Sequence, residues 1–212
     1  MEGFKLTKTQ LLAQQLFRNF AENEIKPIAK EMDETEEYSM DLVKKLQKCH
    51  MFGIPFAKEY GGAGADVLTY TLAMEKVSKV DASTGITLSV HTSLCCPCIN
   101  EFGTEEQKQK FLRPLVDGTK VGCFGLTEAN AGTDAAGVQT TADKDENGNY
   151  IINGQKMFTT NSGFADTFIV FALTDKSKGP KGMSAFILDR DMAISYTHLV
   201  SGRRRVSGRR RA

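Results

Sequence analysis

The chain has 212 residues, enough for one large domain or two small ones, and its 41% hydrophobic and 25% charged residues are ordinary for a globular protein. No apolar run approaches the roughly 20 residues of a membrane-spanning helix, and the N-terminus lacks the apolar core of a secretory signal, so we expect a cytoplasmic protein without a membrane partner. The five cysteines, an odd number, favour free thiols in a reducing compartment.

The first predicted helix spans residues 7–31. Leu12, Leu16 and Phe20 recur every four residues, and Leu11, Phe17 and Ile25 fill out the same predicted apolar face. Pro27 has no backbone N–H, so we expect it to kink or end this helix. The acidic residues that follow are expected to form a solvated connection.

Four further helices are predicted in the first half of the chain. Ser39 is placed to cap one of them, and residues 67–80 form another with an apolar side. Residues 83–99 are nearly uncharged, which predicts a central and fully buried helix. Thr104, with Gln107 three residues later, has the sequence of a capping box at the start of the last helix.

After Gly118 the pattern changes from helical to β. Residues 145–149, Asp-Glu-Asn-Gly-Asn, are a strong hairpin turn signal. Because the helices precede the strands, the sequence predicts an α+β fold with a helical domain at residues 1–118 and a β domain at residues 119–190. Strands are predicted at residues 120–127, 139–143, 150–153, 156–160, 167–173 and 183–188.

The last residues have a composition of their own. Val-Ser-Gly-Arg-Arg-Arg at residues 200–205 is repeated at 206–211, and residues 192–212 contain no Asp, Glu or Lys. Like charges without an apolar face cannot build a core, so we expect disorder in residues 191–212. A frame-shifted or otherwise unnatural terminus is favoured here. A polybasic tail that binds nucleic acid or a membrane surface is the alternative, and it predicts salt-dependent DNA binding.

The chain is organised around residues 123–137, which begin as an apolar strand and become small and polar. Three glycines in this stretch are expected to allow close approach of the backbone to a ligand and to tolerate positive φ. Thr127 and Thr133 supply hydroxyls that donate and accept hydrogen bonds. A surface turn is the plainer interpretation, but neutral N–H and hydroxyl groups also suit the edge of a flat polar heterocycle.

Gly125-Leu126-Thr127-Glu128, followed by Gly132-Thr133-Asp134, resembles the first signature of the acyl-CoA dehydrogenase family. The likeness runs in order from about residue 4 to about residue 190, and its nearest form is the bacterial short-chain, butyryl-CoA type. Three further motifs of the family keep this order: residues 52–62, residues 102–108 and, similar to the second flavin segment, residues 154–161.

The resemblance implies FAD-dependent α,β-dehydrogenation of short-chain acyl-CoA thioesters, with electrons passed to an electron-transferring flavoprotein, in a homotetramer. It also implies that the chain is C-terminally truncated, with an incomplete antiparallel β domain and without the C-terminal four-helix domain. The catalytic Glu of the family would then lie beyond the end of the chain, so we expect the chain alone to be inactive. A non-catalytic fragment that binds flavin or acyl-CoA is the alternative, and an acyl-CoA oxidase is the nearest alternative enzyme.

By the same resemblance, two segments hold the flavin. Leu126 and Thr127 are expected at the pyrimidine edge, and Thr133 beside the pyrophosphate or the CoA substrate. Phe158 is expected on the flavin face, although without the resemblance a core aromatic is the better interpretation. The expected cofactor-binding residues are Phe124, Leu126, Thr127, Gly132, Thr133, Phe158, Thr159 and Thr160.

The remaining reactive side chains are interpreted as structural, so no catalytic residue is expected in the chain. Glu128 could act as a base near a flavin, but we expect its carboxylate to bond local backbone groups, and the same holds for Asp134. His91 is expected to be a satisfied core histidine. The Cys-Cys-Pro-Cys run at residues 95–98 has no second pair of ligands nearby, so no zinc site is expected.

Overall fold

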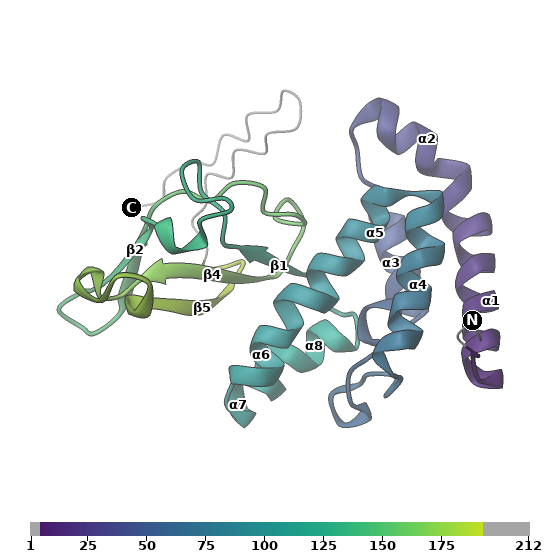
Figure 1. Ribbon diagram of the computed structural model, residues 1–212, viewed down its shortest axis with the longest axis horizontal. Coiled ribbons are helices and arrows are strands. Elements are labelled where there is room, and N and C mark those ends of the chain that lie inside the picture. The colour runs from purple at the N-terminus through teal and green to yellow at the C-terminus, as the bar shows by residue number, and fades with distance from the viewer. Residues whose placement is uncertain (1–4, 193–212) are drawn as a thin grey trace. The chain divides into compact units, whose positions relative to one another are not determined.

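The computed structural model describes residues 5–192 and divides into two compact units (Figure 1). The first unit, up to Lys120, is helical, and the second, from Val121, is built on a sheet. The predicted α+β organisation, with helices first and strands second, is confirmed. The arginine repeat at residues 200–211 lies outside the described residues. None of the described helices is both long enough and apolar enough to span a membrane.

The N-terminal helix continues past Pro27. α1 (Lys8–Phe20) passes through a π-helical turn (Ala21–Ile25) into α2 (Lys26–Thr35), so of the two predicted effects of Pro27, a kink or an end of the helix, the end does not occur. Pro27 lies in the first turn of α2, where a missing N–H is tolerated, and the wider π turn ahead of it absorbs the interrupted hydrogen-bond ladder.

The predicted apolar face of α1 is only partly buried. Phe17 and Ile25 are buried, as predicted, whereas Leu12 and Leu16 are 72% and 61% exposed. The rows that begin at Leu12 and at Phe17 both have the spacing of a helix face, so the period alone cannot decide which of them faces the core.

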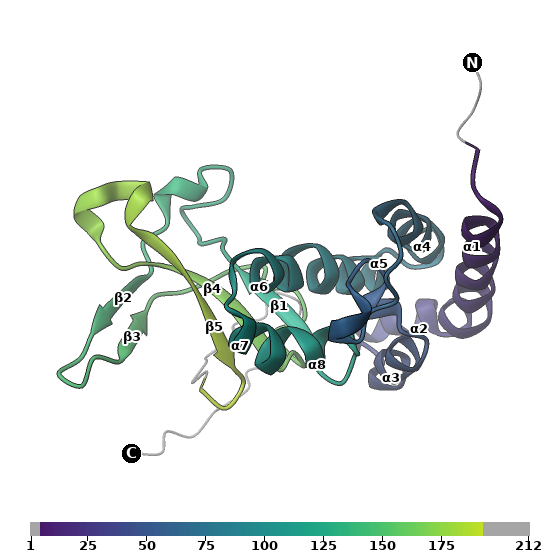
Figure 2. The ribbon, with the colours of Figure 1, turned by 90° about the horizontal axis from the view of Figure 1, so that it is seen from below.

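α4 lies between α1 and α5 and packs against both (Figures 1 and 2). Ser39 caps α3 by accepting a hydrogen bond from the N–H of Leu42, and Thr104 and Gln107 form a capping box, as predicted. π-helical turns, Val90–Cys95 and Lys108–Leu112, join α5 to α6 and α7 to α8. The bounds are α3 (Met40–Lys48), α4 (Val67–Val80), α5 (Ala82–Ser89), α6 (Cys96–Phe102), α7 (Glu105–Gln107) and α8 (Arg113–Val116).

The three π-helical turns within residues 5–192 share one feature. Each is followed by a proline in the first turn of the next helix, namely Pro27, Pro97 and Pro114. The helix predicted at residues 83–99 is not fully buried, because Ile86 and Leu94 are 53% and 41% exposed.

The second unit holds a five-stranded mixed sheet centred on β4 (Figure 2). β4 is antiparallel to β5 and parallel to β1 and β2, so the expectation of a purely antiparallel sheet is corrected by two parallel pairings. β2 and β3 form the hairpin predicted around residues 145–149. The bounds are β1 (Gly122–Gly125), β2 (Thr141–Lys144), β3 (Tyr150–Asn153), β4 (Thr167–Leu173) and β5 (Met183–Asp189).

His91 is the core histidine that the sequence predicts. It is fully buried in the π turn between α5 and α6, with its ring centroid 4.5 Å from that of Phe52. Its Nε2 lies 3.2 Å from the carbonyl oxygen of Leu115, and because a carbonyl only accepts, Nε2 carries the proton. Desolvation lowers the pKa of His91 to about 3, against the hydrogen bond to Leu115, so the ring is neutral.

This burial predicts an acid-sensitive helical unit. Between pH 6.5 and about 3 the unfolded chain protonates this imidazole while the folded chain does not, so the free energy of unfolding falls as the pH falls. The expected slope is up to about 1.4 kcal/mol per pH unit, measured by urea unfolding followed through the helical circular dichroism. His91→Gln, which keeps an N–H for Leu115, is expected to flatten that slope.

The control is His50→Asn. His50 is exposed at φ 52°, a conformation that asparagine also adopts, so this variant is expected to keep the wild-type slope. An equal slope in His91→Gln and in the wild-type chain would show that His91 does not set the acid sensitivity.

Candidate functional site

Two segments that are distant in the sequence lie side by side after β1 and β3. The first leaves β1 at Leu126, and the second follows β3. The N–H of Met157 donates to the carbonyl oxygen of Thr127 at 2.8 Å. The structure therefore brings the predicted residues Leu126 and Thr127 together with the segment that contains Phe158, Thr159 and Thr160.

Phe158 has the most unusual conformation in the second segment. Its φ is 55° and its side chain is 74% exposed. A bulky residue in the left-handed region costs about 1–3 kcal/mol, so the surrounding chain must impose it. Residues 156–160 form no strand, and that prediction is wrong because the chain turns left-handed at Phe158 and again at Asn161, with φ 72°.

The loop that follows is held at several points. The side-chain amide of Asn161 donates to the carbonyl oxygen of Gly122 in β1 at 3.2 Å. Arg190 donates from Nε to the carbonyl oxygen of Ala165 at 2.7 Å and from Nη2 to that of Ser162 at 3.2 Å. Its guanidinium also lies over the ring of Phe168, 5.9 Å from the centroid. The second segment is therefore anchored beyond its exposed phenylalanine.

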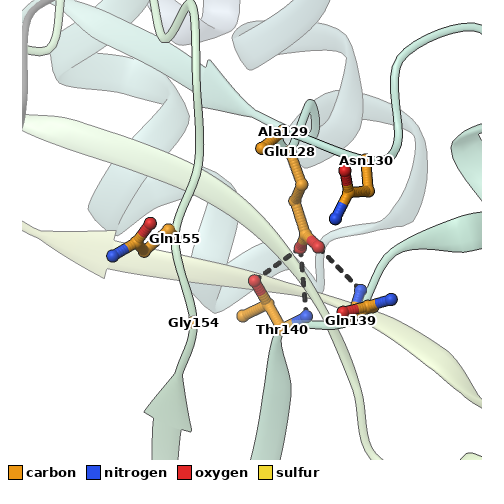
Figure 3. Close-up of a pocket in the computed structure, with 7 residues that line it drawn as sticks. All are labelled: Glu128, Ala129, Asn130, Gln139, Thr140, Gly154 and Gln155. Atoms are coloured by element: carbon orange, nitrogen blue, oxygen red, sulfur yellow. Dashed lines mark hydrogen bonds between the residues drawn. The ribbon is translucent and has the colours of Figure 1, made fainter.

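Glu128 makes the densest set of hydrogen bonds in the site (Figure 3). Its carboxylate accepts from the N–H of Gln139 at 2.7 Å, from the N–H of Thr140 at 3.0 Å and from Thr140 Oγ1 at 2.5 Å. Lys156 Nζ lies 2.8 Å from Oε1. The prediction that the Glu128 carboxylate accepts hydrogen bonds from backbone groups is confirmed, although those groups lie 11 and 12 residues further along the chain.

These contacts set the charge state of Glu128. Desolvation raises its pKa, but the hydrogen bonds from Lys156, Thr140 and Gln139 together outweigh that effect and lower the pKa to about 2. Burial lowers the pKa of Lys156, and the ion pair with Glu128 opposes that shift. Both side chains are about one-tenth exposed, at 11% for Lys156 and 10% for Glu128, so the pair is well shielded from water.

Gly154 is the glycine that the site requires for close approach. A Cβ at this position would lie 2.2 Å from Thr140 Oγ1 and 2.7 Å from Thr140 Cα, so a larger residue would displace the threonine that anchors Glu128. A hollow of about 320 Å³ opens beside these groups (Figure 3) and is lined by Glu128, Ala129, Asn130, Gln139, Thr140, Gly154 and Gln155.

The three glycines of the first segment act differently from what the sequence suggests. Gly125, Gly132 and Gly137 do not use their tolerance of positive φ, since none of them has a positive φ. A Cβ at Gly132 would meet nothing within 4 Å. Asp134 accepts a hydrogen bond from the N–H of Ala136 at 3.2 Å, as its structural interpretation requires.

The other predicted cofactor residues lie at different places. Phe124 is in β1 and stacks against Phe171 of β4, with ring centroids 5.2 Å apart. Gly132 and Thr133 are exposed in the bend that follows the bridge between Glu128 and Ala131. Among residues 5–192, no hydrogen bond joins either of them to the second segment.

Sequence reasoning missed Lys156, Thr140 and Gln139 as parts of the site. A lysine inside the otherwise neutral run from Gly154 to Asn161 was the available signal, because such a charge needs a partner. In the part of the chain that the structure describes, no cluster of His, Cys, Asp and Glu is arranged to hold a metal ion.

Comparisons with known proteins identify the family to which this chain is similar. Residues 7–119 match the profile of the acyl-CoA dehydrogenase N-terminal domain, and residues 123–210 match that of the acyl-CoA dehydrogenase middle domain. The short-chain specific acyl-CoA dehydrogenase of Clostridium acetobutylicum is 59% identical over 187 residues, which cover 88% of this chain and 49% of that protein. The chain thus spans about half the length of the curated relatives it matches.

Solved structures agree with the sequence comparison. Butyryl-CoA dehydrogenase from Megasphaera elsdenii superimposes with a TM-score of 0.85 at 50% identity, covering 89% of this chain and 50% of that one. A glutaryl-CoA dehydrogenase from Mycobacterium smegmatis, solved in complex with FADH2, gives 0.81 at 32% identity, covering 88% of this chain and 46% of that one. The chain belongs to the acyl-CoA dehydrogenase family.

Proposed function

We propose that this chain binds FAD against the wall formed by residues 126–127 and 157–160 and that it serves the α,β-dehydrogenation of short-chain acyl-CoA thioesters. The observation that carries the proposal is Phe158, an aromatic ring kept exposed by a strained backbone beside Thr127. Strain and exposure of this kind oppose folding, and they are retained where a ligand uses them.

The residues present fit a flavin. An isoalloxazine needs an aromatic or apolar surface on its face and polar groups at its edges. Phe158 offers the surface, and the half-buried hydroxyls of Thr127, Thr159 and Thr160 offer the polar groups, together with the backbone of Leu126. Exposed Gly132 and Thr133 are the residues for the pyrophosphate or for the CoA substrate, and Phe124 supports the wall from β1.

FAD, when bound, supplies the hydride acceptor for oxidation of the Cα–Cβ bond. The residues of this chain bind and orient the ring. Glu128 is not available to take the Cα proton, because Lys156 and the donors of Gln139 and Thr140 hold its ionised carboxylate. We place the proton-abstracting Glu outside the chain, so that these 212 residues alone bind flavin without turnover.

The substrate and the partners follow the family and the named relatives. The short-chain specificity of the Clostridium acetobutylicum relative and the butyryl-CoA dehydrogenase structure favour a short-chain acyl-CoA. An electron-transferring flavoprotein is the proposed electron acceptor, and a cytoplasmic homotetramer is the proposed assembly of the whole enzyme.

We assign residues 1–118 to the N-terminal domain and residues 119–190 to the middle domain. The second candidate function is that of a non-catalytic fragment that binds flavin or acyl-CoA. It is favoured because the carboxylate of Glu128 is already held by hydrogen bonds and by Lys156 and is not available as a base.

The first test concerns the flavin face. Phe158→Ala is expected to raise the dissociation constant for FAD about two- to twelvefold, because an aromatic contact of this kind contributes about 0.5–1.5 kcal/mol. Quenching of FAD fluorescence on titration with the chain measures this. Phe102→Ala, which removes an 87% exposed phenylalanine from the helical unit, is the matched control and should leave the affinity unchanged. Equal affinities for all three proteins would refute the proposed wall.

The second test concerns the missing base. Anaerobic addition of butyryl-CoA to the FAD-loaded chain is expected to leave the flavin absorbance unbleached, since none of the described residues is assigned to remove the proton. Dithionite must bleach the same sample, which shows that the bound flavin is reducible. Rapid bleaching by butyryl-CoA would place a functional base within these 212 residues and overturn the assignment.

A further inference from the structure

Lys156 bridges two acceptors of the first segment. Its Nζ donates to the carbonyl oxygen of Leu126 at 3.1 Å and to Glu128 Oε1 at 2.8 Å. Its stem crosses the end of β1, where Lys156 Cγ lies 3.5 Å from the position of a Cβ on Gly125. A substantially buried ammonium is thus directed at the backbone of the segment that precedes Thr127.

Two successive carbonyls of the first segment are held by two successive residues of the second. Leu126 accepts from the Lys156 side chain, and Thr127 accepts from the Met157 N–H. The first bond carries a full positive charge, so it is the stronger of the two. The Leu126 carbonyl and the Thr127 N–H belong to one peptide unit. A cation on the oxygen therefore polarises that unit and strengthens the N–H as a donor.

Glu128 does not require this lysine for its hydrogen bonds. Gln139 and Thr140 already supply three donors to the carboxylate, and desolvating an ammonium beside it is costly. The bond to Leu126 is the contact that gives Lys156 a separate role.

We propose that Lys156 is a positioning residue of the flavin wall, which fixes the Leu126–Thr127 peptide against the second segment and strengthens the Thr127 N–H as a donor to a bound ligand. The inference rests on the proposed function, since FAD is the ligand concerned. It concerns how the wall is held and polarised, which the family assignment leaves open.

The first arm of the test needs no cofactor. In the apo chain, Lys156→Met is expected to move the Thr127 amide proton upfield in a ¹H–¹⁵N spectrum. Lys76→Met is the matched control, because Lys76 is also 11% exposed and lies 2.8 Å from a single carboxylate, that of Glu75 in α4. Lys156→Gln, a neutral donor, is expected to give a smaller shift in the same direction and decides the question if the methionine variant does not fold.

A double-mutant cycle separates this role from simple charge balance. If Lys156 acts through the Leu126 carbonyl, Lys156→Met moves the Thr127 amide equally in the wild-type and Glu128→Gln backgrounds. If it merely balances Glu128, the effect disappears in the Glu128→Gln background, and the proposal is wrong.

The second arm measures FAD binding. Lys156→Met is expected to raise the dissociation constant about tenfold, the size of one charge-assisted hydrogen bond, while Lys76→Met leaves it unchanged. Wild-type affinity together with an unmoved Thr127 amide in Lys156→Met would overturn the inference and leave the flavin assignment intact. Absence of FAD binding by the wild-type chain would overturn the proposed function, and the amide shift would then report only whether Lys156 holds Leu126.

Discussion

The second unit depends on one carboxylate that joins three separate pieces of chain. Glu128 is at the end of the first segment, its backbone and hydroxyl donors come from Gln139 and Thr140 ahead of β2, and its cation comes from Lys156 after β3. Because these groups are largely shielded from water, each is costly to leave unpaired, so the three pieces keep a fixed relation to one another. The close contact of Gly154 with Thr140 depends on the same relation.

The site combines stiffness with strain. Hydrogen bonds from Met157, Asn161 and Arg190 tie the second segment to β1 and to the end of β5. Phe158 lies between these ties, and its left-handed backbone persists because the residues on both sides are fixed. A surface presented by such a loop is already formed before a ligand arrives, so less ordering entropy opposes binding.

The features that the sequence predicted best are those determined by neighbouring residues. The caps at Ser39 and Thr104 and the bounds of α4 and β4 follow from neighbouring residues, and the structure agrees with them. Features that depend on contacts with distant parts of the chain were predicted poorly. The apolar rows of α1 that begin at Leu12 and at Phe17 have the same spacing, and only packing against α4 determines which of them is buried. The parallel pairings of β4 join strands that are distant in the sequence. For the site, the two segments were found from motifs. The left-handed turn at Phe158 and the bridge made by Lys156 carry no local signal of comparable strength.

The three proline-marked π turns have a consequence for how the helical unit tolerates changes in length. A π turn holds one residue more than an α turn would, and in a helix each residue rotates the side-chain direction by about 100°. The side chains of the helix after such a turn are therefore rotated about the helix axis relative to those of the helix before it. Deleting a single residue from Val90–Cys95 would restore a uniform helix and swing Ile99 out of the core.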